Sequence, residues 1–339
     1  MNFKPLAEQT IVLTGATSGI GLVTARMAAQ AHAKLVLAAR NEDALRVLVN
    51  EIVGKGGKAI YVVTDVGDEA QVQALSKAAV DEYGGFDTWI NDAGVSIYGR
   101  LLEIPTEDHR KLFDTNFWGI VYGSLEAARH FKARGGNYAG VIINLGSTVS
   151  DQSLPVQGMY ATSKHAIKGF TDALRMEMEK EGAPLALTLI KPSSIATPFP
   201  EHAKNYMEHE PTLPPPLYAP DAVAEAILHA VVAPQRDVFV GGGGKMLGAL
   251  GSYVPGLGDK IVGGPVYDQQ TTDQPADPHR QDALHQAGKD LNERGTFDAH
   301  ISESSPYTRV VQSPLLKAAL AISAGVALAS IVKRLSNKG

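Results

Sequence analysis

The stretch TIVLTGATSGIG at residues 10–21 decides the fold, because it joins an apolar run to a glycine-rich turn. The run at 10–14 predicts a buried strand, and LVTARMAAQAH from residue 22 predicts a helix directly after the turn. Glycines here let backbone N–H groups approach a pyrophosphate, whose charge is favoured at a helix N-terminus. The spacing is G-x3-G-x-G, and a plain glycine turn is the alternative. The order of strand, turn and helix favours a dinucleotide-binding turn.

Further apolar runs recur along the chain and alternate with longer stretches of helical pattern. They occupy residues 34–39, 58–63, 87–91, 140–145, 185–190 and 237–241. Unbroken apolar runs are typical of strands buried on both faces, and the stretches between them are long enough for helical crossovers. The sequence therefore predicts an α/β fold, a doubly wound parallel sheet of the Rossmann type, in a single main domain over residues 1–242.

Three segments differ in character from this pattern. Residues 192–220 contain eight prolines and are expected to form a substrate lid. Residues 243–313 are largely polar and predict a partly ordered extension, because such segments lack the apolar surface that offsets ordering entropy. Residues 314–339 predict an apolar tail helix. For its apolar part at 315–332, membrane association and packing against the domain or a partner subunit are the two interpretations.

Composition excludes several classes of function. The 31 Lys and Arg against 36 Asp and Glu give a formal charge of -5, which offers no attraction for nucleic acid. The absence of cysteine excludes disulfides, thiolate zinc sites and cysteine nucleophiles. No HExxH spacing is present, and no metal is expected. The N-terminus lacks the apolar core of a secretory signal, so a cytoplasmic protein is expected.

Five features together identify a resemblance. TGATSGIG at 14–21, NDAG at 91–94, Asn116, Ser147 and Y-x3-K at 160–164 stand in the order and approximate spacing of the short-chain dehydrogenase/reductase family. The chain resembles this family over about residues 7–242. The resemblance implies an NAD(P)-dependent oxidoreductase that interconverts a carbonyl and a secondary alcohol, acts on a small molecule and assembles as a homodimer or homotetramer.

The resemblance also implies a set of cofactor-binding residues at the ends of the strands and on the helices that follow. They are Thr14, Gly15, Thr17, Ser18, Gly19, Ile20, Gly21, Arg40, Asn41, Asp65, Val66, Asn91, Ala93, Gly94, Tyr160, Lys164, Pro192 and Thr197.

The end of the second strand bears on the choice of cofactor. Ala39 stands where relatives that prefer NAD carry Asp, and Arg40 follows it. A guanidinium suits a 2′-phosphate through paired, charge-assisted hydrogen bonds, which favours NADP(H) over NAD(H). A solvated Arg is the alternative, and Ser18 lacks the basic character found there in many NADP-binding relatives. Asp65 is expected to contact the adenine, cap the following helix, or do both.

The YATSK stretch places Tyr160 and Lys164 four residues apart on one helix face. A nearby cation lowers the pKa of a phenol, which is normally near about 10. The resemblance gives Tyr160 the role of proton donor, tuned by Lys164. The resemblance also implies that Ser147, at a strand end, polarises the carbonyl and that Asn116 supports a water relay. Alone, Ser147 would be read as a cap and Asn116 as a solvent-facing residue.

Two departures from the family pattern affect the expected site. Asp92 replaces the second Asn of the usual NNAG, and Ser193 replaces the Gly that normally follows Pro192. Apolar side chains that predict either an apolar substrate pocket or simple packing of the loops are Val149, Leu154, Val156, Met159, Phe199, Tyr206 and Met207. A cofactor-binding scaffold without turnover and a nicotinamide-dependent lyase or epimerase are the rival functions.

Overall fold

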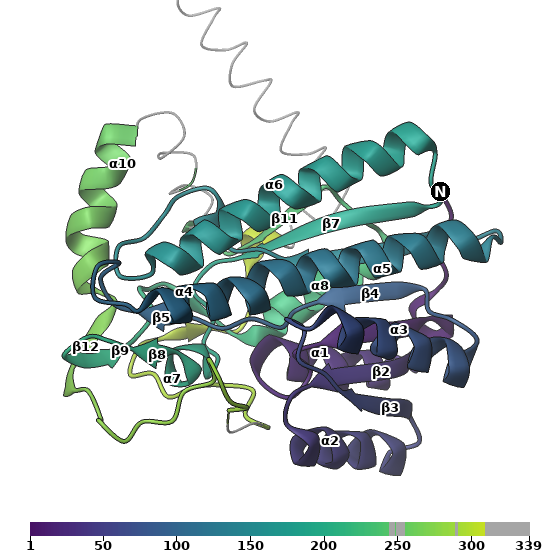
Figure 1. Ribbon diagram of the computed structural model, residues 1–339, viewed down its shortest axis with the longest axis horizontal. Coiled ribbons are helices and arrows are strands. Elements are labelled where there is room, and N and C mark those ends of the chain that lie inside the picture. Colours follow the sequence, from purple (N-terminus) through teal and green to yellow (C-terminus); the bar gives the residue numbers. More distant parts are fainter. Residues whose placement is uncertain (244–247, 249–254, 289–290, 309–339) are drawn as a thin grey trace, which may run out of the picture.

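The computed structural model describes residues 1–243, 248, 255–288 and 291–308 (Figure 1). Within this part of the chain a seven-stranded sheet forms the centre, in the order β11-β7-β6-β4-β1-β2-β3. All of its strand pairs are parallel. The strands are β1 (Thr10–Thr14), β2 (Lys34–Ala39), β3 (Lys58–Val63), β4 (Thr88–Asn91), β6 (Gly140–Leu145), β7 (Leu185–Pro192) and β11 (Asp237–Val240). The predicted doubly wound parallel sheet is confirmed.

Helices cover both faces of the sheet, and alternate residues of one strand point into different core layers. Ile11 and Leu13 of β1 lie in one layer and Val12 lies in the other. The first layer is completed by α1 (Gly19–Gln30), α2 (Glu42–Gly54) and α8 (Pro220–Val232). The second is completed by α3 (Glu69–Tyr83), α5 (Gly119–Arg134) and α6 (Gly158–Glu181). Burial on both faces explains why the strands are apolar without alternation.

The predicted lid segment at 192–220 folds into short elements beside the sheet. They are α7 (Phe199–His202), β8 (Lys204–Asn205), β9 (His209–Pro211) and β10 (Leu217–Tyr218). Strand β8 pairs with β5 (Ile97–Tyr98), which follows β4 in the chain. Helix α4 (Thr106–Phe113) and a π-helical turn (Asp114–Trp118) then lead into α5.

The described residues beyond 242 pack against the lid and the glycine turn. Strand β12 (Thr271–Pro275) pairs antiparallel with β9, and β13 (Ile301–Ser302) pairs parallel with β10. The backbone N–H of Gly19 donates to the Asn292 carbonyl at 2.9 Å. Helix α10 (Pro255–Ile261) and a further π-helical turn (Val262–Val266) lie between these contacts and β11 in the chain. The polar composition of residues 243–313 did not indicate these contacts, because backbone groups make them.

The predicted tail helix at 314–339, with its apolar part at 315–332, lies outside the described residues. Among the residues that are described, no helix is long and apolar enough to cross a membrane. Within the same residues, no cluster of three or more His, Asp or Glu side chains could hold a metal ion.

A buried polar network joins the second core layer to the strands. Asn91 Nδ2 donates to Asn144 Oδ1 at 2.8 Å, and Asn144 Nδ2 donates to the Thr171 hydroxyl at 3.0 Å. The Ser124 hydroxyl donates to Asn144 Oδ1 at 3.1 Å. Asn144 thus ties β6 to β4, α5 and α6 while being completely buried.

We expect Asn144→Ala to lower the free energy of unfolding by about 1–3 kcal/mol, because it removes the donor to the buried Thr171 hydroxyl and one of the two acceptors of the buried Asn91 amide. Asn50→Ala, at an exposed position of α2, should change it by less than about 0.5 kcal/mol. Urea unfolding measures both, and equal midpoints for the two variants would contradict this role of Asn144.

Candidate active site

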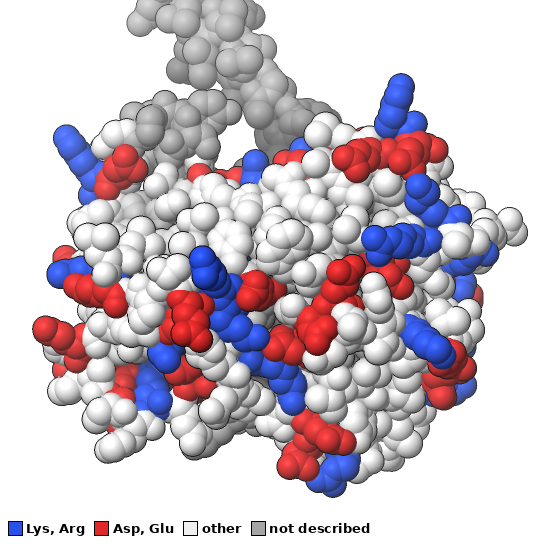
Figure 2. Space-filling view, in the orientation of Figure 1, with Lys and Arg blue, Asp and Glu red and all other residues white. Residues whose placement is uncertain are grey.

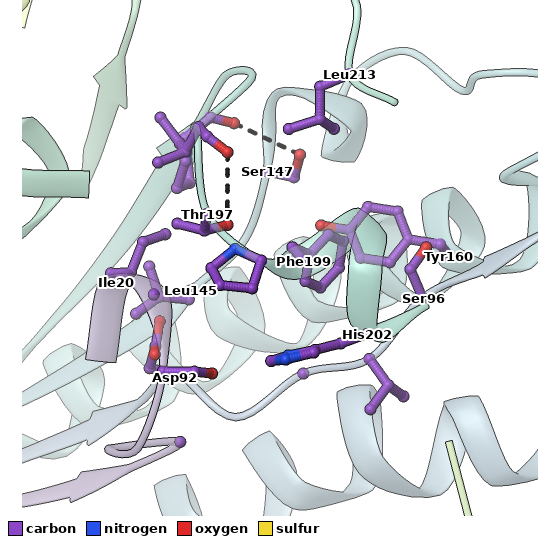
Figure 3. A pocket seen from close by; sticks show the side chains of 18 of the residues that line it. Ile20, Asp92, Ser96, Leu145, Ser147, Tyr160, Thr197, Phe199, His202 and Leu213 are labelled. Atoms are coloured by element: carbon purple, nitrogen blue, oxygen red, sulfur yellow. Dashed lines mark hydrogen bonds between the residues drawn. The ribbon is translucent and has the colours of Figure 1, made fainter. Parts of the chain in front are cut away.

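A cavity of about 440 Å³ opens where β1, β4, β6 and β7 end. The carboxyl ends of parallel strands meet at one edge of an open α/β sheet, which is where such folds bind ligands. The glycine turn, the lid and the start of α6 complete its walls, and Figure 3 shows their side chains converging on it.

The turn between β1 and α1 requires its glycines. Gly15 and Gly19 have positive φ angles of 72° and 52°. A Cβ on Gly21 would lie 2.1 Å from the Gly15 carbonyl oxygen, and one on Gly15 would lie 2.8 Å from Ala93 Cα. The turn therefore packs backbone against backbone on the loop after β4, and the N-terminus of α1 lies beside the cavity. This cradle fits the pyrophosphate of a dinucleotide.

Tyr160 and Ser147 meet in the cavity, as the sequence predicts. Ser147 follows β6 and accepts a hydrogen bond from the Val149 N–H at 3.2 Å, so it is also a helix cap. The Ser147 hydroxyl donates to the Pro192 carbonyl at 3.5 Å, and both Ser147 and Tyr160 line the cavity. The Tyr160 ring packs on Phe199 of the lid, with 5.5 Å between ring centroids, and Figure 3 shows all three side chains together. The hydroxyls of Ser147 and Tyr160 can therefore reach one ligand atom.

Lys164 lies one helical turn behind Tyr160 on α6. Its Nζ is 5.6 Å from the centroid of the Tyr160 ring and donates to the Leu145 carbonyl at 2.8 Å. Leu145 ends β6, so this hydrogen bond ties α6 to the strand that leads to Ser147. The side chain is 5% exposed.

Asp92 of the NDAG stretch adds a carboxylate that the sequence analysis did not assign to the site. Burial raises the pKa of Asp92 to about 7, although Lys164 and the Gly21 N–H oppose the rise. Burial lowers the pKa of Lys164 to about 8, and the Asp92 charge opposes that fall. Asp92 and Lys164 are therefore electrostatic partners in the wall of the cavity.

The pKa of Tyr160 shifts opposite to the predicted lowering by Lys164. Burial raises this pKa to about 12, the nearby Ser147 hydroxyl opposes the rise, and the Asp92 charge adds to it. The spacing in the sequence reveals the nearby cation, whereas burial and the proximity of the Asp92 carboxylate depend on the fold.

Asn116 lies in the π-helical turn and not in a regular helix. It is completely buried. Its Oδ1 accepts from the Val95 N–H at 2.8 Å, and its Nδ2 donates to the Val95 carbonyl at 2.9 Å. Nδ2 also reaches the Ser163 hydroxyl at 3.2 Å. Asn116 therefore holds the chain after NDAG in place and does not line the cavity.

Most predicted cofactor residues line the cavity. Those that do are Gly15, Thr17, Ser18, Gly19, Ile20, Arg40, Asn41, Asp65, Val66, Ala93, Gly94, Tyr160, Lys164, Pro192 and Thr197. Thr14, Gly21 and Asn91 lie behind this lining. The Thr14 hydroxyl accepts from the Asp92 and Ala93 N–H groups at 3.2 and 3.3 Å, and so supports the loop.

Asp65 faces the cavity after β3. Its carboxylate accepts from Lys111 Nζ at 2.9 Å and from the Gly67 N–H at 3.0 Å. Burial alone would raise the pKa of Asp65, but these hydrogen bonds outweigh it and the pKa is lowered. The alternative role as a helix cap is wrong, because Asp68 caps α3 through the Ala70 N–H.

Several residues of the lining were not predicted from the sequence. Besides Asp92, these residues include Ser96, Gln157, His202, Leu213, Ala283, Ala287 and Gly288. The change from NNAG to NDAG was a signal for Asp92, whereas nothing local distinguished the others. Of the seven apolar side chains considered for the pocket, Val149, Leu154 and Phe199 line it. The other four are Val156, Met159, Tyr206 and Met207, which pack in neighbouring clusters.

Comparison with known proteins agrees with this arrangement. The family model for short chain dehydrogenase matches residues 9–207. The uncharacterized oxidoreductase YxnA of Bacillus subtilis is 43% identical over 335 residues, which cover 98% of this chain and 93% of that protein.

Two solved structures share the fold. A short chain dehydrogenase/reductase from Burkholderia phymatum, in complex with NAD, has a TM-score of 0.64 at 25% identity, covering 81% of this chain and 99% of that one. A short-chain type dehydrogenase/reductase from Mycobacterium marinum has a TM-score of 0.59 at 26% identity, covering 69% and 94%. This chain belongs to the short-chain dehydrogenase/reductase family of NAD(P)-dependent oxidoreductases.

Proposed function

We propose that this protein is an NADP(H)-dependent oxidoreductase that interconverts a carbonyl and a secondary alcohol, with Tyr160 as proton donor and acceptor. The observation that carries the proposal is that the side chains of Tyr160 and Ser147 lie in one cavity, with Lys164 fixed behind Tyr160. A protein that only bound the cofactor would have no need of this arrangement.

The cofactor would lie along the cavity from the glycine turn to Tyr160. Gly15, Gly19 and Ile20 would hold the pyrophosphate, and Lys164 would hydrogen-bond the nicotinamide ribose. When bound, the nicotinamide supplies or accepts the hydride. Pro192 and Thr197, both in the 192–220 segment, would lie beside the nicotinamide. The family resemblance assigns these roles, and the position of the residues in the lining of the cavity supports them.

The residues of this chain would handle the carbonyl oxygen and the proton. Ser147 and Tyr160 both donate hydrogen bonds to the oxygen of a bound carbonyl. As negative charge develops on that oxygen, two donors and the Lys164 ammonium stabilise it. Tyr160 then passes its hydroxyl proton to the oxygen. In the direction of oxidation the same proton returns to Tyr160.

The preference for NADP(H) rests on Arg40 and Ala39. Arg40 lies at the edge of the cavity, and no carboxylate occupies position 39 to repel a 2′-phosphate. The Burkholderia relative was solved with NAD, so the family as a whole does not decide this preference. Leu154, Val149 and Phe199 favour a substrate with an apolar body.

We also propose that the protein forms a homodimer or homotetramer and lies in the cytoplasm. Membrane attachment through residues 315–332 is the alternative. The first halves of α5 and α6 carry few charges, and the surface over them is largely uncharged in Figure 2. Trp118 is 43% exposed beside this area and stacks on Tyr122. An exposed Trp that stacks on a partly buried Tyr suits a subunit interface.

Tyr160→Phe should lower kcat for NADPH-dependent reduction of ketones by about 10²- to 10⁴-fold, because it removes the proton donor. Its affinity for NADPH, measured by fluorescence titration, should match that of the native chain. Tyr138→Phe is the matched control, since Tyr138 is 40% exposed and away from the cavity. Turnover by Tyr160→Phe at the level of the control would show that another group supplies the proton.

Asp92→Asn should move the alkaline fall of reductase activity to lower pH. An amine is charged below its pKa, so the positive field is lost as pH rises through the pKa of Lys164, which is about 8 in the native chain. The Asp92 charge raises this pKa, and its removal therefore lowers it. The pH profile of kcat/KM measures the shift. Glu179→Gln removes an exposed charge of α6 as the control, and identical profiles for both variants would refute the coupling.

A further inference from the structure

The extension contributes a wall to the cavity that no part of the main domain provides. We name residues 282–288 the strap. Ala283, Ala287 and Gly288 of the strap line the cavity together with Arg40 and Asn41, which follow β2. The strap therefore covers the end of the site where the resemblance places the adenosine of the cofactor.

The strap holds the Arg40 side chain through its backbone. Arg40 Nη2 donates to the Ala283 carbonyl at 2.5 Å, and Nη1 donates to the Leu284 carbonyl at 3.3 Å. Carbonyl oxygens are uncharged, so these bonds orient the guanidinium without neutralising it. A guanidinium has five N–H donors, and the two used here leave others for a ligand.

Asn41 is held in the same way. Its Nδ2 donates to the Gly288 carbonyl at 3.3 Å, while its Oδ1 accepts from the Ala44 N–H at 3.0 Å and caps α2. Arg40 and Asn41, which follow β2, thus both donate hydrogen bonds to strap carbonyls.

The strap itself is anchored on parts of the protein that do not touch Arg40. Leu284 is completely buried in a cluster with Val95, Ile97, Ile104 and Leu112. His285 Nε2 lies 2.7 Å from Asp108 Oδ1 of α4, and the Ala283 N–H donates to the His202 carbonyl at 2.8 Å. These contacts hold the strap carbonyls in place independently of the side chain that they orient.

We propose that the strap is a specificity element of the cofactor site, which positions the Arg40 guanidinium to bind the 2′-phosphate of an adenosine nucleotide. An Arg at a strand end would otherwise have to be ordered when the ligand binds, which weakens binding. The strap orders it beforehand. This inference rests on the proposed NADP(H) preference and adds the segment that produces it.

The test uses the full chain and two probes, adenosine 2′,5′-bisphosphate and 5′-AMP, which differ by the 2′-phosphate alone. Isothermal titration gives the ratio of their affinities. Arg40→Ala should reduce that ratio by about 10- to 100-fold, because charge-assisted hydrogen bonds are lost. Leu284→Ala and His285→Ala, which loosen the strap and keep Arg40, should reduce it by about 2- to 10-fold.

The control for the cavity left by Leu284→Ala is Leu75→Ala, at an equally buried position of α3. It should leave the ratio unchanged. His285→Ala is the second strap variant, for use if Leu284→Ala does not fold. In it, Asp108 keeps its hydrogen bond from the Tyr206 hydroxyl at 2.6 Å. A native ratio in whichever strap variant folds, with a reduced ratio in Arg40→Ala, would overturn the strap proposal alone. A native chain that binds both probes equally would overturn the NADP(H) preference and the strap proposal together.

Discussion

The hydrogen bond from the Lys164 ammonium to the Leu145 carbonyl connects the parts of the site. Leu145 ends β6 and Lys164 lies on α6, so the bond fixes the strand that leads to Ser147 against the helix that carries Tyr160. A buried ammonium requires acceptors and a compensating charge, and Asp92 after β4 provides that charge. Asp92 in turn touches the glycine turn through the Gly21 N–H. The buried Lys164 ammonium thus connects the carboxyl ends of β6, β4 and β1.

This arrangement also explains the direction of the pKa shifts. Burial opposes the charged forms of Tyr160, Lys164 and Asp92 alike, and the mutual attraction of Lys164 and Asp92 recovers part of the loss. In the proposed reaction, the ammonium would favour negative charge on the ligand oxygen next to Tyr160. The Tyr160 proton would then leave more readily during the reaction than it does from the resting side chain.

The sequence predicted the sheet because every central strand is an unbroken apolar run, and burial on both faces requires that pattern. The resemblance singled out Ser147, Tyr160 and Lys164, and the structure places all three in one cavity, while their catalytic roles stay a prediction. The sequence did not predict the contacts of the strap with Arg40, because backbone carbonyls make them and a backbone acceptor leaves no trace in side-chain identity. Nor did it predict the raised pKa of Tyr160, which depends on how deeply the ring is covered.

The most direct measurement follows the hydride itself. The full chain would be incubated with NADPH carrying deuterium at the transferred position of C4 and with a panel of apolar ketones, and products would be analysed by mass spectrometry. We expect an alcohol with one deuterium on the carbinol carbon and an equal amount of NADP⁺. Tight binding of NADPH without labelled alcohol from any ketone, or a substrate that is rearranged while NADPH is not consumed, would contradict this expectation.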